Sequence, residues 1–169
     1  MISIAIVGPE STGKSTLASD LASHYNTVCV PEYSREFLSS LNRPYVKEDL
    51  LAIAKGQLAE EQKYRGKADR LIFLDTDLFV VKVWSEFKYG DCDPSILQLL
   101  STNQAGFYLL TSPDIPYEED PLRESPKDRE RLFDIYHKVL VDAGVDFHVV
   151  EGSDHTRFQN AIQAINKMV

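Results

Sequence analysis

A loop near the start of the chain has the residue types of a phosphate-binding site. Residues 8–15 read GPESTGKS and match the pattern G-x-x-x-x-G-K-[ST] at every fixed position. Glycine at both ends lets the backbone turn tightly and approach phosphate oxygens, where a Cβ would interfere. Successive backbone N–H groups of such a loop hold an anion at the positive end of the helix that follows. The spacing therefore predicts a site for ATP or GTP.

The loop residues have separate expected roles toward the nucleotide. Lys14 is expected to reach the β- and γ-phosphates, and Ser15 to ligate Mg²⁺. Thr16 is expected to make polar contacts near the α-phosphate. The residues that we assign to nucleotide binding are Gly8, Glu10, Ser11, Thr12, Gly13, Lys14, Ser15 and Thr16.

Two carboxylates follow apolar runs and are candidates for the rest of the chemistry. Glu32 comes just after the run that Pro31 ends, where it can accept a proton from a substrate hydroxyl or hold a Mg²⁺-bound water. An ordinary place in the first turn of a helix fits Glu32 equally well. Asp75 ends the run RLIFLD, as the Mg²⁺-positioning carboxylate of a Walker B strand does. For Asp77, a helix N-cap and a place beside Asp75 both remain open.

A polar stretch punctuated by prolines, TSPDIPYEEDPLRESPKD, occupies residues 111–128. Its length and its arginines predict a lid over about residues 113–128 that brings an arginine to the transferring phosphate. Arg123 and Arg129 are the candidates, with Arg131 close by. The alternative is a surface loop whose charges pair locally.

These residues need a scaffold that brings them together, and the hydrophobic pattern predicts one. Short apolar runs alternate with helical stretches, which indicates an α/β fold with a five-stranded parallel sheet and helices on both faces. The expected strands are 2–7, 27–30, 70–75, 106–110 and 146–150, and the expected helices are 14–25, 47–63, 78–88, 129–140 and 156–168. Ligands bind outside the carboxyl ends of such strands, where the candidate residues lie. We therefore expect a P-loop NTPase fold.

Composition limits the remaining possibilities. The 169 residues suit a single domain, 1–169, and the net charge of −8 argues against a dedicated nucleic-acid binder. No apolar run is long enough for a membrane span, and the N-terminus lacks the features of a signal peptide. Cys29 and Cys92 lack metal or redox spacing, so we expect reduced thiols in a cytoplasmic protein.

Three further segments, together with the loop, resemble the NadR-type ribosylnicotinamide kinase domain. They read PEYSREF, DTDLFVVKVWSEFKYG and PDIPYEEDPLRESPKDR, in this order, so that the resemblance covers nearly the whole chain. It implies a nucleoside-kinase-like fold that uses ATP and Mg²⁺ to phosphorylate the 5′-hydroxyl of nicotinamide riboside, giving nicotinamide mononucleotide. With the roles argued above, the expected catalytic residues are Lys14, Glu32 as base, Asp75, and the lid residues Arg123 and Arg129; the expected metal ligands are Ser15, Asp75 and Glu32.

The leading hypothesis is thus a small-molecule kinase whose partner is a nucleoside. A kinase for another nucleoside or nucleotide, and a P-loop regulatory ATPase or switch, are the alternatives. The acid after the second strand and the arginine-bearing lid favour a kinase, because a kinase must enclose its acceptor. NadR proteins also carry DNA-binding and adenylyltransferase domains before the kinase part, and only the kinase expectation is carried over. Aromatic residues flank the expected cleft, some of them expected in the core, as Phe87 is, and others able to stack on a flat base: Tyr33, Tyr45, Trp84, Phe87, Tyr89 and Tyr117. The positively charged nicotinamide ring that the resemblance implies would suit aromatic and acidic neighbours.

Overall fold

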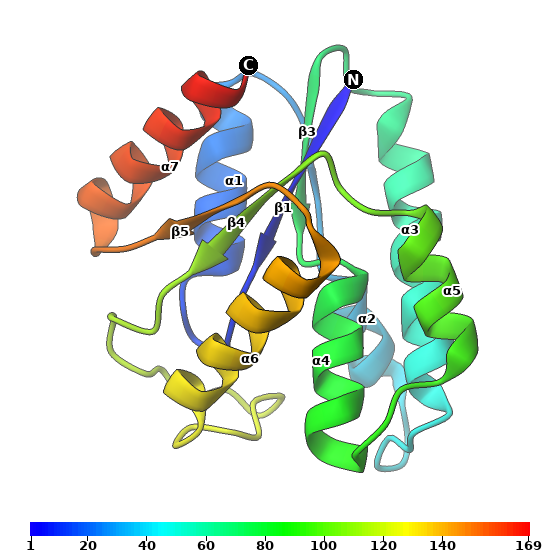
Figure 1. Ribbon diagram of the computed structural model, residues 1–169. Coiled ribbons are helices and arrows are strands. Elements are labelled where there is room, and N and C mark those ends of the chain that lie inside the picture. The colour runs from blue at the N-terminus through cyan, green and yellow to red at the C-terminus, as the bar shows by residue number, and fades with distance from the viewer.

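Five parallel strands form the centre of the molecule in a computed structural model that describes residues 1–169 (Figure 1). The strands are β1 (Ile2–Val7), β2 (Cys29–Val30), β3 (Leu71–Asp75), β4 (Phe107–Thr111) and β5 (Phe147–Val150), in the spatial order β2-β3-β1-β4-β5. Ile4 of β1 pairs with Phe73 of β3 on one side and with Phe107 of β4 on the other. Because β3 and β4 lie on opposite sides of β1, the loop after β1 sits at the switch point where such sheets bind ligands.

Seven helices cover the two faces of the sheet. They are α1 (Lys14–His24), α2 (Tyr33–Ser40), α3 (Asp49–Arg65), α4 (Leu78–Tyr89), α5 (Pro94–Thr102), α6 (Arg129–Ala143) and α7 (Asp154–Met168). Alternate side chains of each strand point to opposite faces. Ala5 and Val7 therefore join one apolar core with α3 to α6, while Ile4 and Ile6 join a second core with α1 and α7. None of these helices combines the length and the apolar character that crossing a membrane requires.

The expected α/β class is confirmed, and the predicted elements correspond to observed ones within a few residues. The second strand is shorter than predicted because the N–H of Thr27 donates to Ala22 O at the end of α1, at 2.9 Å, and is not available to the sheet. The hydrophobic pattern does not predict α2 or α5. For α5 the sequence does hold a start signal: Asp93 accepts the N–H of Ser95 at 2.7 Å, and Pro94 occupies the first turn.

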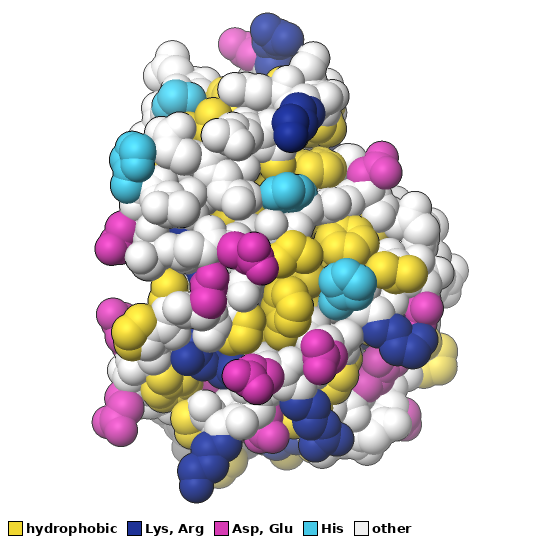
Figure 2. All heavy atoms as spheres, turned by 60° about the vertical axis from the view of Figure 1, so that its left-hand side comes forward, with side chains coloured by type: hydrophobic (Ala, Val, Ile, Leu, Met, Phe, Trp, Pro, Cys, Tyr) yellow, Lys and Arg dark blue, Asp and Glu magenta, His cyan; other side chains and the backbone are white.

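Strand β5 forms one edge of the sheet and lies between α6 and α7. Figure 2 shows this side of the molecule, with apolar side chains exposed among polar and charged ones. Phe147 and Val149 are only partly buried against the core. The functional residues lie elsewhere, at the carboxyl ends of the strands.

Candidate active site

The loop 8–15 joins β1 to α1 and packs on the end of β4. Gly8 has a φ of +139°, and a Cβ there would lie 2.5 Å from Thr111 Oγ1 and 2.9 Å from Thr111 O. The Thr12 hydroxyl donates to Pro9 O at 2.8 Å and lies 2.6 Å from Thr111 Oγ1. The backbone N–H groups of residues 10–16 make no hydrogen bond within the protein. The loop is therefore fixed by its contacts with Thr111 at the end of β4, and its backbone N–H groups are free to bind an anion.

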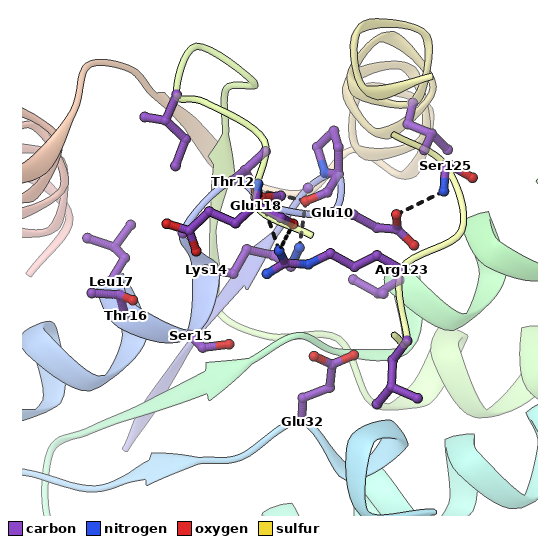
Figure 3. A pocket seen from close by; sticks show the side chains of 18 of the residues that line it. Glu10, Thr12, Lys14, Ser15, Thr16, Leu17, Glu32, Glu118, Arg123 and Ser125 are labelled. Carbon is purple, nitrogen blue, oxygen red and sulfur yellow. Dashed lines mark hydrogen bonds between the residues drawn. The ribbon is translucent and has the colours of Figure 1, made fainter. Parts of the chain in front are cut away.

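Lys14 lies along this loop. Its Nζ donates to Pro9 O at 2.7 Å. Burial lowers the pKa of Lys14, while the negative charges of Glu32, Asp75 and Glu10 act in the opposite direction. Figure 3 shows Lys14, Ser15 and Glu32 bordering the same pocket. Lys14 thus places a positive charge in a site that also contains the side chains of Glu32, Asp75 and Glu10.

Asp75 ends β3 beside the loop, as predicted. Its side chain is buried, and its Oδ1 has no hydrogen-bond partner. Burial raises the pKa of Asp75, and the neighbouring Ser15 side chain lowers it. The chain turns sharply at Thr76, whose φ is +75°, so Asp77 accepts the N–H of Phe79 at 2.9 Å. Of the two places open to Asp77, the helix N-cap is the correct one.

Ser15 and Asp75 fit a magnesium ion. Asp75 has a buried Oδ1 without a partner, the Ser15 side chain lies close to the Asp75 carboxyl group, and both residues offer oxygen ligands. No group of three or more His, Cys, Asp or Glu side chains could hold a metal ion by itself. Mg²⁺ in nucleotide sites takes one or two protein ligands and completes its shell with phosphate oxygens and waters.

Glu32 occupies the N-cap position of α2 without capping the helix. The buried Gln57 of α3 does so instead, because its Oε1 accepts the N–H of Tyr33 at 2.9 Å. The Ser34 hydroxyl donates to Glu32 Oε1 at 2.5 Å, and Arg35 Nε lies 3.4 Å from Glu32 Oε2. A helix does start at Glu32, one of the two places left open for it, yet the carboxylate is oriented by two neighbours and points into the pocket (Figure 3).

A glycine in α3 allows α2 to sit this close. A Cβ at Gly56 would lie 1.9 Å from Cε1 of Tyr33. The Tyr33 ring therefore packs directly on the α3 backbone. Helix α3 fixes α2 through this contact and through Gln57, and so fixes the position of Glu32.

The segment predicted as a lid, 113–128, lies against the phosphate-binding loop. Ser11 Oγ accepts the N–H of Glu118 at 2.8 Å and a hydrogen bond from Arg123 Nη1 at 3.2 Å. Arg129 donates to Ser11 O and to Ile115 O, both at 2.9 Å. Both candidate arginines thus reach the loop, Arg123 through a side-chain oxygen and Arg129 through the backbone.

The remaining loop side chains divide into two groups. Glu10 is turned toward the segment 113–128, where its carboxylate accepts backbone N–H groups, and Thr12 is bound within the loop. Ser15 and Thr16 are exposed and border the cavity. Any contribution of Glu10 and Thr12 to phosphate binding therefore comes from their backbone.

One cavity of about 920 Å³ contains the loop and extends well beyond it. This volume lies in the range of small-molecule sites. Residues 8–17 line one half, which we call the donor half. Beyond Glu32 and Arg35, the lining becomes mainly apolar; this acceptor half includes Leu38, Val80, Val83, Trp84, Phe87, Leu132 and Tyr136.

Arg157 of α7 is a candidate that the sequence pattern does not reveal. It is 4% exposed, and it donates to Thr12 O at 2.6 Å, to Ser112 O at 2.9 Å and to Gly152 O at 2.7 Å. It also forms an ion pair with Asp114. Arg157 therefore ties together the loops that follow β1, β4 and β5. The sequence gives only one signal for Arg157: the apolar spacing of the last helix predicts that this position, although occupied by an arginine, is buried.

Comparison with known proteins gives matches over most of the chain. Residues 3–157 match a family model described as AAA domain. The trifunctional NAD biosynthesis/regulator proteins NadR of Salmonella typhimurium and Escherichia coli are each 27% identical to it in an alignment of 176 residues. The match covers 98% of this chain and 42% of each relative, so the chain spans less than half the length of these curated relatives.

Solved structures share the fold. A NadR protein in complex with NAD and AMP-PNP has a TM-score of 0.84 at 21% identity, covering 98% of this chain and 49% of that chain. A deoxyadenosine kinase from M. mycoides has a TM-score of 0.69 at 14% identity, covering 98% of this chain and 100% of that chain. A thymidylate kinase from Ehrlichia chaffeensis has a TM-score of 0.68 at 15% identity, with coverages of 99% and 98%. The predicted P-loop fold and the predicted resemblance to NadR are confirmed.

Proposed function

The chain belongs to the AAA domain family, and on that premise we propose that it is an ATP-dependent nucleoside kinase. The acceptor that we propose is the 5′-hydroxyl of nicotinamide riboside, and the product is nicotinamide mononucleotide. Residues 1–169 would form one kinase domain, with 113–128 as its lid. The relatives named above support this proposal through the NAD biosynthesis in their names and through a NadR structure in complex with NR.

The observation that carries the proposal is the composition of the cavity of about 920 Å³. A phosphate-binding loop and a mainly apolar acceptor half open into the same space, and Glu32 lies between them. A switch that only senses its nucleotide has no use for a second half of this kind. A kinase needs it, because the hydroxyl must meet the γ-phosphoryl group out of bulk water.

The residues of the donor half act on the phosphates of ATP. The free N–H groups of residues 10–16 and the Lys14 ammonium hold the phosphates and offset the charge that develops during transfer. Arg123, now bound to Ser11 Oγ, can exchange this partner for a phosphate oxygen. A magnesium ion held by Ser15 and Asp75 would neutralise part of the phosphate charge when bound.

Glu32 acts on the acceptor. The hydroxyl oxygen forms a bond to the γ-phosphorus, the bond from that phosphorus to the bridging oxygen of ADP breaks, and the hydroxyl proton passes to the Glu32 carboxylate. Ser34 and Arg35 orient this carboxylate without filling the pocket. Its position between the two halves suits this role.

An aromatic side chain of the acceptor half suits a cationic ring. Trp84 lines this half, and Tyr45, outside the lining, packs edge to face against it with ring centroids 5.0 Å apart. Lys88 Nζ already lies 3.9 Å from the centroid of the Tyr45 ring, so Trp84 is the ring whose face could attract a further positive charge. Nicotinamide riboside carries such a charge on its flat ring, unlike the common nucleosides, and this difference is what the acceptor half could select.

The test is an acceptor panel. The protein is incubated with MgATP and nicotinamide riboside, adenosine, cytidine, thymidine or no acceptor, and ADP and phosphorylated product are both measured. We expect product and ADP in equal amounts, with nicotinamide riboside giving the highest kcat/KM. ADP formed at one rate whatever the acceptor would instead favour the regulatory ATPase, and a higher kcat/KM for another nucleoside would correct the acceptor.

A further inference from the structure

Glu10 places a negative charge inside a loop built to bind anions. Its Oε1 accepts the N–H of Glu124 at 3.0 Å, and its Oε2 accepts the N–H of Ser125 at the same distance. Figure 3 shows the carboxylate turned toward Ser125 and away from Ser15. Hydrogen bonds to an ionised acceptor are shorter and stronger than neutral ones. The carboxylate thus binds the backbone of the segment 113–128 to the donor half.

The side chain of Glu124 reaches the acceptor half. Its Oε2 accepts the hydroxyl of Tyr45 at 2.6 Å, and its Oε1 lies 3.0 Å from Lys88 Nζ. Trp84 Nε1 donates to the same Tyr45 hydroxyl at 2.9 Å. One residue is therefore bound to the donor half through its backbone and to the acceptor half through its side chain.

We propose that Glu10 is a positioning residue that holds the segment 113–128 closed, and that Glu124 makes this closure depend on both halves of the cavity. What the closure serves rests on the proposed function: a closed segment keeps water from the γ-phosphoryl group, so that the acceptor hydroxyl, and not water, attacks the γ-phosphorus. The two N–H groups converge on one oxygen, since Glu10 Oε2 also lies 3.1 Å from the N of Glu124. Glutamine can supply that oxygen, whereas alanine cannot.

The test compares Glu10→Ala and Glu10→Gln with Glu119→Ala. Glu119 is an exposed glutamate of the same segment whose carboxylate makes no hydrogen bond or ion pair, so its variant is the matched control. For Glu10→Ala we expect the ratio of acceptor phosphorylation to ATP hydrolysis to fall about tenfold, as for one lost hydrogen bond to a charged group. Glu10→Gln restores most of the ratio, and Glu119→Ala behaves as the wild type. An equal ratio in Glu10→Ala and wild type overturns the proposal.

Two readouts need no acceptor. In Glu10→Ala the amides of residues 124 and 125 exchange faster, and acrylamide quenches Trp84, the only tryptophan, more strongly. If Glu10 and Glu124 hold the same closed arrangement of the segment 113–128, the effects of Glu10→Ala and Glu124→Ala on this quenching are less than additive in the double variant. Additive effects would contradict the proposal. A wild-type protein that phosphorylates no acceptor removes the proposed function, whereas exchange and quenching that do not respond to Glu10→Ala remove the closure.

Discussion

The donor and acceptor halves of the cavity are built in different ways. The donor half comes from one continuous stretch, residues 8–17, whose backbone supplies most of the expected contacts. The acceptor half combines side chains from α2, α4 and α6 with the segment 113–128. Backbone donors tolerate many side chains as long as the turn is kept, whereas an assembled half depends on every element that contributes to it.

This difference separates what is general from what is specific. A loop that holds phosphates can serve any reaction of ATP. The acceptor half decides which hydroxyl comes near Glu32, and it is made of elements that the loop does not constrain. Changes in the two halves should therefore affect different kinetic constants, which the following variants can show.

The largest effect is expected in the donor half, from Lys14→Ala. Removing a preorganised charge that stabilises the transition state lowers kcat about a thousandfold. Lys55→Ala, which removes an exposed lysine of α3 without a hydrogen-bond partner, should leave kcat unchanged. Steady-state kinetics with MgATP measure both. If Lys14→Ala keeps wild-type kcat and ATP affinity, the loop does not have the role assigned to it.

Glu32→Gln tests the border between the halves. Loss of a general base lowers kcat about a hundredfold, while KM for ATP should change little because the loop is untouched. Glu36→Gln changes an exposed glutamate one turn further along α2 and is the matched control. Retention of full transfer activity by Glu32→Gln would remove Glu32 as base.

Arg157→Ala tests how far the donor half depends on distant support. The substitution removes the donor of three carbonyl groups and the cation beside Asp114, which keeps only the N–H of Gly152 as a partner, so the free energy of unfolding should fall by about 3 kcal/mol. Denaturant unfolding measures the change, and Arg157→Lys should recover part of it. KM for ATP should rise in the folded fraction, because Thr12 O loses its donor. An unchanged unfolding free energy would show that the three loops hold together without Arg157.

A pH effect is expected from the scaffold behind the acceptor half. Burial, aided by the charge of Asp77, raises the pKa of Glu61 in α3 from 4.5 to about 7. The folded state therefore binds the proton more tightly, and this contribution to stability is lost as pH rises from about 4.5 to about 7. Glu61→Gln should raise the free energy of unfolding by about 3 kcal/mol near pH 8 and hardly at all near pH 4. An equal change at both pH values would contradict the shift.

The smallest effect is expected from Tyr45→Phe, beside the acceptor half, where Tyr45 packs against the lining residue Trp84. The ring remains, and only the hydroxyl that joins Trp84 and Glu124 is lost. KM for the acceptor should rise about threefold, the size of one modest hydrogen bond, with KM for ATP unchanged. Tyr64→Phe, whose hydroxyl makes no hydrogen bond, serves as control. A change in KM for ATP, with KM for the acceptor unchanged, would show that Tyr45 supports the donor half and not the acceptor half.

The donor half was predictable because its pattern is local. Eight residues between an apolar run and a helix define the loop, and the ends of two further runs indicate Glu32 and Asp75. The alternation of apolar runs and helices predicts the parallel sheet in the same way. Each of these signals lies within one element and its neighbours.

The other contacts could not be predicted, because they join residues far apart in the chain. Nothing near Glu10 in the sequence shows that its carboxylate binds residues 124 and 125. Arg157 contacts Thr12 across 145 positions of sequence. The periodicity of a helix indicates which face is buried, but it does not indicate which carbonyl groups a buried side chain such as Arg157 will contact.

The hydrogen atom that serves as the side chain of Gly56 sets the place of the Glu32 carboxylate. Alanine is a better helix former than glycine, so by local preference alone Gly56→Ala should strengthen α3. The added methyl group would nevertheless collide with Tyr33, one position from Glu32. An attempt to make this chain more thermostable by helix propensity alone would therefore select position 56, and the collision would displace α2 together with the Glu32 carboxylate.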